Sequence, residues 1–445
     1  MTVRSSINRR SFLKQTGAVL TAAVSAPLVL PSSVLGREGV TAPNSRVNMA
    51  FIGCGRQTYK KNLPLFMRTK GVKVVAVCDV DSWRLDQTIE QIKKQYATGR
   101  VRGKYTPVDK YVDYNDVLAR KDVDAVMIAT PDHWHAKMAV DAMKAGKDVS
   151  LEKPITRTIK EGQDLIKAAK ENNRIFRVDS DFRSVEGVHR ATSLVRNGYI
   201  GKVKKVTVCV PQSDVPCPPQ PDMPVPPELD YERWQGPAPR AAYTLNRVHP
   251  VKDFARPGWM RNLYYCDGMI TNWGTHLNNG AMWATNLDHT GPTDIEATGE
   301  YPGRESFWNV LLKFNVNFRF ADGLEWTYRT EKPYFFIEGE DGWVRANFKT
   351  FDAYPKSLLT LELKPSDQHF RFKSEKQDFV ECVRNREETL EPAEVGHRVT
   401  SMGILAHISI KLGRKLKFDP AAEKFIDNDA ANAYLDKPIL EPRYA

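Results

Sequence analysis

The sequence has few cysteines, and their spacing matches no metal site. Six cysteines occur in 445 residues, with no CxxC pair and no Cys/His cluster, which argues against a zinc module. Cys54 and Cys78 fall at the ends of apolar runs and are predicted to be buried thiols. Cys209 and Cys217 could pair in an oxidising compartment, and the sequence leaves that question open. We therefore expect no metal.

The sequence also lacks a concentrated basic tract. The formal net charge is +11, but residues 1–36 hold four basic and no acidic side chains, so the rest of the chain carries +7. This charge is scattered, without the basic and aromatic interleaving of a nucleic-acid-binding surface. We expect no nucleic acid as a partner.

The N-terminal segment has no hydrophobic run long enough to span a membrane. Its weakly apolar stretch, residues 17–30, is interrupted at Pro27 and is shorter than the roughly 20 residues that a spanning helix needs. Arg9 and Arg10 precede Ser-Phe-Leu-Lys, which resembles a twin-arginine export signal. A basic amphipathic start and an uncleaved anchor are the alternatives. We predict a signal over residues 1–36, a periplasmic location and no stable membrane insertion.

Two apolar runs flank a glycine pair near the start of the remaining chain. Val47 to Ile52 leads into Gly53 and Gly55, and Val72 to Val77 ends just before Asp79. A strand, a glycine turn, a helix and a second strand with an acidic tip form a dinucleotide-binding βαβ unit. Gly53 permits the tight turn, and Gly55 lets the backbone approach a pyrophosphate.

The acidic tip and one departure from the glycine pattern refine this prediction. Asp79 can accept hydrogen bonds from an adenosine ribose and repels a 2′-phosphate, so NAD is favoured over NADP. Thr58 stands where the third glycine of GxGxxG is usual. We therefore expect looser packing of the helix on the strand.

The order of predicted strands and helices changes near residue 180. Strand and helix patterns alternate over 46–180, which predicts a doubly wound parallel sheet, a Rossmann domain. Over 181–419 most strands lack intervening helices, which predicts an α+β domain with a large, open, mainly antiparallel sheet that is packed on one face. Residues 420–445 are predicted to be a tail. Pro211 to Asp230 is predicted to be a long ordered loop or lid. The second set of strands is expected at 202–210, 307–320, 324–329, 334–338 and 343–348.

Five motifs in order resemble the Gfo/Idh/MocA oxidoreductases. They are GCGRQ, the Asp79 strand end, TPDHWH (Thr130 to His135), LEKP (Leu151 to Pro154) and GMITNWGTHLNN (Gly268 to Asn279). The resemblance covers about Arg46 to Asp419. It implies oxidation or reduction of sugars and polyols with a nicotinamide cofactor, and a homo-oligomer, a dimer or tetramer, formed through the open sheet.

Lys153 is the lysine of the LEKP motif and follows a short apolar strand. The carboxyl ends of parallel strands meet at the ligand crevice. An ammonium there can stabilise oxyanion character on a hydroxyl that becomes a carbonyl. By the resemblance, Lys153 is catalytic, and Glu152 is its partner or a strand-end charge.

Asn272 and His276 are four residues apart in a helical pattern and are predicted to share a face. An imidazole suits general base catalysis on a hydroxyl. The family more often has aspartate at the first position. An amide can orient His276 but cannot stabilise its imidazolium as a carboxylate does. We therefore expect His276 to be a weaker base, or Lys153 to take a larger part in proton transfer.

The remaining site residues follow from the motifs and their neighbours. His133 and His135 are close enough in sequence to suggest a metal, but no further ligands are spaced for one. The predicted cofactor-binding residues are Gly53, Cys54, Gly55, Arg56, Gln57, Asp79, Thr130, Pro131, His133, His135, Glu152 and Lys153. The predicted substrate-binding residues are Arg183, Arg247, His249, Tyr264 and Tyr265.

Three functions agree with these residues. The first is an exported oxidoreductase that transfers hydride to and from a sugar with tightly held NAD, because no NAD pool exists outside the cytoplasm. The second is a redox-assisted glycosidase, in which oxidation, elimination, hydration and re-reduction occur in one site. The third is a catalytically silent nucleotide-binding protein, against which Lys153 and His276 argue.

Overall fold

The computed structural model describes residues 46–444 except 102–104 and 214. The predicted signal over 1–36 lies outside the described residues. All elements named below belong to one compact unit that begins at Val47. Within the described part of the chain, no helix combines the length and apolar character needed to cross a membrane.

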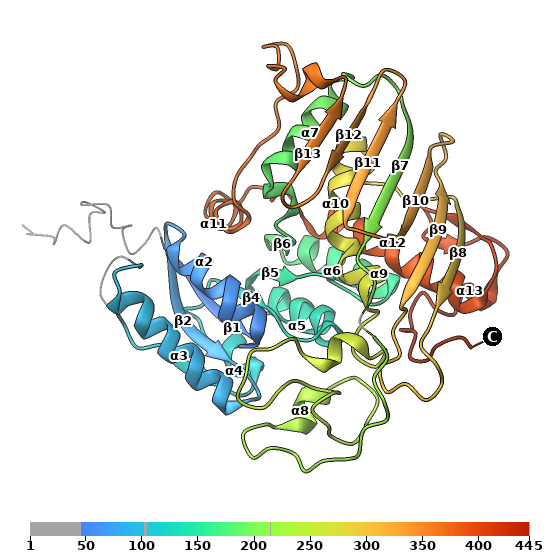
Figure 1. Cartoon of the computed structure of the whole chain (residues 1–445). Helices are drawn as coiled ribbons and strands as arrows, with labels where there is room; N and C mark the ends of the chain where they lie inside the picture. Colours follow the sequence, from blue (N-terminus) through green and yellow to red (C-terminus); the bar gives the residue numbers. More distant parts are fainter. Residues whose placement is uncertain (1–45, 102–104, 214, 445) are drawn as a thin grey trace, which may run out of the picture. The chain divides into compact units, whose positions relative to one another are not determined.

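The first sheet has six parallel strands in the order β3-β2-β1-β4-β5-β6 (Figure 1). This is the doubly wound order of a Rossmann domain, so that prediction is confirmed. Its strands are β1 (Val47–Ile52), β2 (Val72–Cys78), β3 (Asp109–Tyr111), β4 (Ala125–Ile128), β5 (Asp148–Glu152) and β6 (Phe176–Asp179). Its helices are α2 (Leu63–Arg68), α3 (Ser82–Ala97), α4 (Tyr114–Leu118), α5 (Asp132–Lys144) and α6 (Ile159–Glu171).

Local sequence explains where these elements begin. All residues of β4, β5 and β6 are buried, as expected for parallel strands covered on both faces. The Asp81 side chain caps α3 by accepting from the Arg84 N–H. Thr158 and Glu161 form a capping box at the start of α6. The short β3 has no buried residue, which is why apolar patterning did not predict it.

The second sheet has nine strands in the order β13-β12-β11-β7-β10-β9-β8-β14-β15. Only the β7–β10 pair is parallel, so the prediction of a mainly antiparallel sheet is confirmed. The strands are β7 (Val203–Val210), β8 (Asp294–Glu300), β9 (Lys313–Arg319), β10 (Glu325–Thr330), β11 (Tyr334–Gly339), β12 (Trp343–Ala346), β13 (Phe351–Tyr354), β14 (Leu416–Asp419) and β15 (Lys424–Phe425).

One face of this sheet is packed and the other is open. Residues of β9 alternate strictly between exposed and buried. Helices α7 (Glu186–Arg196), α10 (Gly274–Thr285) and α12 (Ala393–Leu412) cover the packed face (Figure 1). α11 (Glu375–Asn385) packs instead against β1 and β6 of the first sheet. The predicted one-sided burial is therefore confirmed.

Two boundaries differ from the sequence-based expectation. The strand expected over 307–320 begins only at Lys313, because the Phe307 N–H donates to the Cys217 carbonyl and the Asn309 N–H to the Arg261 carbonyl instead of to a neighbouring strand. The predicted tail is packed on the domain as far as residue 444. It contains β15 and α13 (Asp429–Asn432), and it buries Phe425 and Ile439 in the main core cluster.

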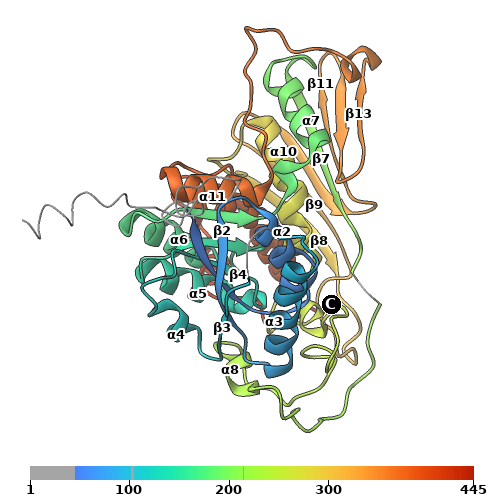
Figure 2. The same ribbon diagram turned by 90° about the vertical axis from the view of Figure 1, so that its left-hand side faces the viewer.

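The proline-rich insert crosses from the second sheet to the first domain. Apart from residue 214, residues 211–228 contain no helix or strand, as the prediction of a long loop requires. We call residues 228–262 the strap. It contains α8 (Tyr231–Gln235) and the 3-10 turn η4 (Gly258–Arg261). It attaches to the segment after β2 through Ser82 N–H to Glu228 O and Asp230 N–H to Val80 O, both 2.9 Å. In Figure 2, α8 of the strap lies below β3 and α3.

All six cysteines are free thiols with buried side chains. Burial raises the pKa of Cys54 and Cys78, which fits the predicted inert thiols. Cys209 and Cys217 are not joined in this structure.

Candidate active site

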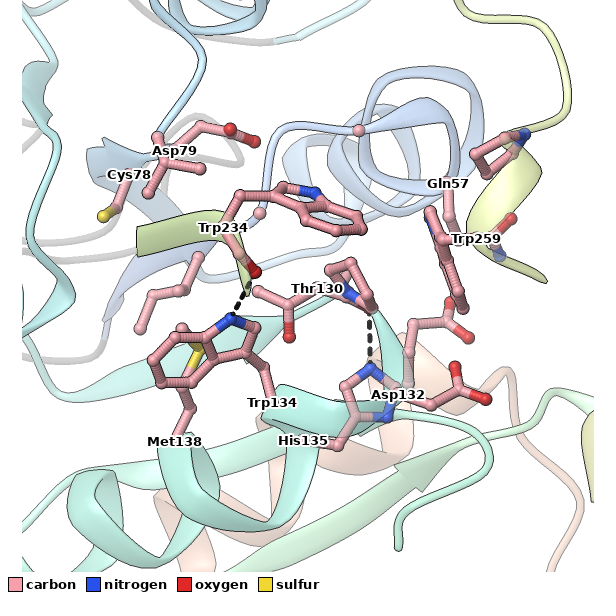
Figure 3. A pocket seen from close by; sticks show the side chains of 18 of the residues that line it. Gln57, Cys78, Asp79, Thr130, Asp132, Trp134, His135, Met138, Trp234 and Trp259 are labelled. Carbon is pink, nitrogen blue, oxygen red and sulfur yellow. Dashed lines mark hydrogen bonds between the residues drawn. The ribbon is translucent and has the colours of Figure 1, made fainter. Parts of the chain in front are cut away.

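A cavity of about 470 Å³ lies at the carboxyl edge of the parallel sheet, beneath the strap. Parallel sheets bind their ligands at this edge. Figure 3 shows Asp79 and Asp132 on opposite sides of the cavity, with Trp134 and Trp234 between them. Ten predicted cofactor residues line it, namely Gly53, Gly55, Arg56, Gln57, Asp79, Thr130, Pro131, His135, Glu152 and Lys153.

The two glycines of the turn serve different needs. Gly53 has a φ of +90°, and a Cβ there would lie 2.6 Å from the Ala129 carbonyl oxygen, so the chain itself requires glycine. A Cβ on Gly55 would meet no atom within 4 Å. Gly55 therefore leaves open space on the cavity side, where a pyrophosphate would approach the backbone.

Thr58, in place of the third glycine, is fully buried and donates from Oγ1 to the Gly53 carbonyl over 2.5 Å. The helix after the turn widens at this point into a π-helical turn, η2 (Thr58–Asn62). Such turns are frequent at functional sites. The looser packing expected from Thr58 stays a prediction.

Asp79 is held by backbone donors. Its carboxylate accepts from the Cys54 N–H at 2.6 Å and the Asp81 N–H at 2.9 Å. Burial and the Asp81 carboxylate raise the pKa of Asp79 to about 6, and Arg84 opposes them. Cys54 thus helps through its backbone, while its side chain lies outside the cavity lining.

Lys153 lines the cavity and is positioned by a break between two helices. Its Nζ donates to the Asn272 carbonyl over 3.3 Å. α9 (Met269–Asn272) ends there, and the His276 N–H bonds the Trp273 carbonyl. The Asn272 carbonyl is therefore available to the ammonium. Burial lowers the pKa of Lys153, while Glu152 and Asp132 oppose the shift.

Asn272 and His276 occupy two helices rather than one continuous face. Asn272 lines the cavity, whereas His276 lies in α10 just behind it, beside Lys153 and Lys61. Burial, followed by these two lysines, holds the pKa of His276 well below its usual value. No hydrogen bond joins the side chains of Asn272 and His276, both of which the structure describes. The predicted orienting contact is therefore absent.

The two histidines of TPDHWH face different neighbours. His135 Nδ1 lies 2.7 Å from the Pro154 carbonyl and Nε2 2.9 Å from the Thr130 carbonyl, so this ring ties together two loops of the cavity (Figure 3). His133 lies outside the cavity lining, with Nε2 3.2 Å from the Trp234 carbonyl. In the part of the chain that the structure describes, no group of three or more ligating side chains could hold a metal.

Of the predicted substrate residues, only His249 lines the cavity. Arg183 is buried and committed to Asp288 and Asn279, which corrects its predicted exposure to a substrate. Arg247 stacks on Tyr264 and Phe307 instead of reaching inward. Tyr265 is fully buried against Trp234 and His133, so it packs against the strap instead of facing the cavity.

Asp132 was missed, although it stands inside a recognised motif. It is the first residue of α5, lines the cavity and is 3% exposed, and its Oδ2 has no hydrogen-bond partner. Burial raises the pKa of Asp132 to about 8, and Lys153 opposes the shift. A buried, perturbed carboxylate in a cleft marks a functional site. Its position shortly after the end of β4, in the loop that enters the cavity, could have identified it from the sequence.

Two family models match this chain. The NAD-binding Rossmann fold of the oxidoreductase family GFO_IDH_MocA matches residues 47–180, and the family's C-terminal alpha/beta domain matches residues 217–444. The chain belongs to the Gfo/Idh/MocA oxidoreductase family. Its first domain is therefore an NAD-binding Rossmann domain. Oxidoreductase-type chemistry follows from the family, whereas the substrate does not.

Curated relatives and solved structures add more specific likenesses. The chain is 31% identical over 208 residues to an alpha-N-acetylgalactosaminidase of Shewanella oneidensis and to a glycosyl hydrolase family 109 protein of Shewanella sp. strain ANA-3. Each match spans 44% of this chain and 44% of the relative.

The fold resembles the aldose-aldose oxidoreductase of Caulobacter crescentus complexed with glycerol, with a TM-score of 0.59, 19% identity and coverage of 84% of this chain and 100% of that one. It also resembles the WlbA dehydrogenase of Bordetella pertussis in complex with NADH and UDP-GlcNAcA, with a TM-score of 0.59, 18% identity and coverage of 84% and 99%. At these identities the likeness concerns the fold alone.

The residues present fit a nicotinamide dinucleotide. The open space at Gly55 suits a pyrophosphate, and Asp79 suits a ribose. At the other end, the buried Thr130 Oγ1 and Asp132 Oδ2 have no hydrogen-bond partners. Buried polar atoms are normally satisfied, so these two could bind polar groups of such a cofactor or of its substrate.

Proposed function

We propose that this protein oxidises a hydroxyl group of a sugar or glycoside with an NAD cofactor that it retains between turnovers, and that the hydride held on the cofactor then reduces a second sugar. The observation that carries the proposal is the pair Lys153 and Asp132 in the lining of the cofactor cavity, with His276 just behind that lining. When bound, the nicotinamide supplies hydride transfer. Lys153 donates a hydrogen bond to the substrate oxygen as it becomes a carbonyl, and His276 takes the hydroxyl proton.

A redox-neutral glycosidase is the second candidate, and the names of the Shewanella relatives favour it. In that reaction, oxidation of a ring hydroxyl acidifies the neighbouring C–H, and loss of that proton expels the glycosidic leaving group. Water then adds to the alkene, and hydride returns to the carbonyl. The catalytically silent alternative leaves Lys153, which lines the cavity, without a role.

Product analysis separates the candidates. Protein is incubated without added NAD with p-nitrophenyl α-N-acetylgalactosaminide, and separately with mixed aldoses, in deuterated water. Release of p-nitrophenol with deuterium on a sugar carbon supports the glycosidase. A matched pair of oxidised and reduced sugars supports the oxidoreductase. Inactivity of NAD-loaded protein on both, and on a wider set of sugars and glycosides, would contradict the proposal.

The strap is the structural basis for retention. Arg84 of α3 is 3% exposed, and its Nη2 lies 3.0 Å from His249 Nδ1, 3.1 Å from the Pro250 carbonyl and 3.0 Å from the Asp253 carbonyl. Phe254 stacks on Tyr59 with ring centroids 4.0 Å apart. These contacts join the strap to the Rossmann domain directly beside the cavity.

Replacing Arg84 with methionine is expected to speed NAD release by about tenfold to a hundredfold, because hydrogen bonds from a charged group contribute about 1.5–3 kcal/mol. The measurement is the loss of bound nucleotide after dilution into buffer with a nucleotide scavenger. Arg240→Met is the control, since Arg240 pairs with Glu232 inside the strap. Equal release from both variants would refute the retaining role of the strap.

We also propose export to the periplasm by the twin-arginine route, which rests on the sequence of residues outside the described part. Replacing Arg9 and Arg10 with lysine is expected to keep the protein in the cytoplasm. Cell fractionation measures this, with an unchanged signal as control. Undiminished periplasmic recovery of the variant would contradict the export proposal.

A homo-oligomer and a preference for NAD over NADP remain proposals. The open face of the nine-stranded sheet, where Asn315, Asn317 and Arg319 of β9 are exposed, is the surface that an oligomer would use. Asp79 at the ribose end supports NAD, because its carboxylate repels a 2′-phosphate.

A further inference from the structure

Two buried polar atoms face each other behind Lys153. His276 Nδ1 and Asp181 Oδ1 are 3.8 Å apart, and neither has a hydrogen-bond partner. Buried polar atoms without partners are rare and call for an explanation. Hydrogen bonds in catalytic groups are often long without substrate and shorten in the complex. The pair is therefore positioned to form one hydrogen bond.

The position of Asp181 is fixed by an ion pair and by an uncommon backbone conformation. Lys61 forms an ion pair with its other oxygen, Oδ2. The backbone of Asp181 is left-handed, with a φ of +54°, which is uncommon for a residue other than glycine. Local strain of this kind persists where the surrounding structure fixes it, and it clusters at functional sites.

The surroundings of His276 are aromatic and positively charged. The rings of Phe348, Phe182 and Trp273 pack around the imidazole, with centroids 5.1, 6.3 and 6.3 Å away. Lys153 and Lys61 both disfavour an imidazolium. Without a nearby carboxylate, an imidazole in this position would accept a proton poorly.

We propose that Asp181 is the positioning residue for His276 and supplies the carboxylate that Asn272 lacks. This inference rests on the proposed function, in which His276 takes the substrate proton. Asp181 fixes the proton of the neutral ring on Nδ1, leaves Nε2 as the base and stabilises the imidazolium that forms as the hydroxyl proton arrives. The substrate carbon loses hydride to the cofactor in the same reaction.

The charged groups around the pair set the direction of its pH dependence. Lys153 follows β5, Lys61 lies in η2, and Glu375 lies in α11. Burial and Glu375 raise the pKa of Asp181 to about 7, while Lys61 opposes them. The carboxylate is therefore ionised above this value, and its support for His276 is lost as the pH falls through it.

The first test needs no substrate. Protein with bound NAD⁺ and ¹⁵N-labelled histidine is examined by NMR over a range of pH, and His276 is assigned with His276→Gln. Above pH 7, where Asp181 is ionised, we expect the neutral wild-type ring to carry its proton on Nδ1, and Asp181→Asn to weaken this preference. An unchanged tautomer in Asp181→Asn would overturn the inference, whether or not any substrate is turned over.

The second test measures turnover of the active probe from the product analysis. Asp181→Asn is expected to lower kcat on the order of 10²-fold and to move the acid limb of the profile to lower pH, with NAD content unchanged. Asp352→Asn is the control, because this carboxylate on β13 is also paired with a lysine, Lys356. A slower variant with an unmoved acid limb would show a structural role only and overturn the inference.

Discussion

Replacing Lys153 with methionine is expected to lower turnover on the order of 10³-fold while leaving the cofactor in place. Methionine preserves most of the side-chain volume but removes the only donor that this residue offers to a developing oxyanion, and loss of one such donor costs 10²–10³-fold or more. The removed contact within the protein is one 3.3 Å hydrogen bond to the Asn272 carbonyl. The melting temperature is therefore expected to change little.

The measurement is kcat with whichever substrate the product analysis finds active, together with the nucleotide content of the same sample. Lys144→Met is the control, because Lys144 is an exposed residue of α5. Because burial lowers the pKa of Lys153, wild-type activity that needs the ammonium form should decline at a lower pH than an exposed lysine would give. Turnover near the wild-type value in Lys153→Met would remove this residue from the mechanism.

Replacing Gly53 with alanine is expected to destabilise the Rossmann domain by about 2 kcal/mol or more and to abolish nucleotide retention. The φ of +90° disfavours any side chain, and the new Cβ would lie 2.6 Å from the Ala129 carbonyl oxygen. Relief would move β4 away from β1, and the cavity is built on the ends of both strands. Chemical denaturation and nucleotide content measure the two effects.

Gly55→Ala is the matched comparison. Its Cβ would meet no protein atom within 4 Å, so stability should stay within about 0.5 kcal/mol of the wild type. Nucleotide affinity should fall by tenfold or more, because the methyl group occupies the space of a pyrophosphate. Equal stability losses in both variants, or tight nucleotide binding by Gly55→Ala, would contradict the roles assigned to these glycines.

The fold could be predicted from the sequence where burial is strong on both faces. The five longer strands of the parallel sheet are apolar runs, and Thr158 with Glu161 marks the start of α6. The exposed β3 and the two-residue β15 carry no such pattern. Residues 307–312 are apolar enough for a strand, but the N–H groups of Phe307 and Asn309 bond Cys217 and Arg261, long-range contacts that local patterning does not reveal.

The site was predictable where a motif coincided with a strand end. Gly53, Asp79 and Lys153 line the cavity for this reason. Arg183 lies outside the cavity and pairs with Asp288, which is more than 100 positions away in the sequence. Asp181 was missed because its closeness to His276 depends on how β6 meets α10 across the two domains. The spacing of residues along the chain predicts neither of these two contacts.

The nucleotide content of the protein as isolated tests whether the cofactor is retained between turnovers. Protein purified without added cofactor is denatured, and the NAD and NADH released per chain are measured by chromatography, while an intact portion is assayed with the active probe and no external nucleotide. We expect close to one nucleotide per chain, NAD(H) in place of NADP(H), and many turnovers without added nucleotide. Protein that is isolated empty and is active only with millimolar NAD supplied would contradict it.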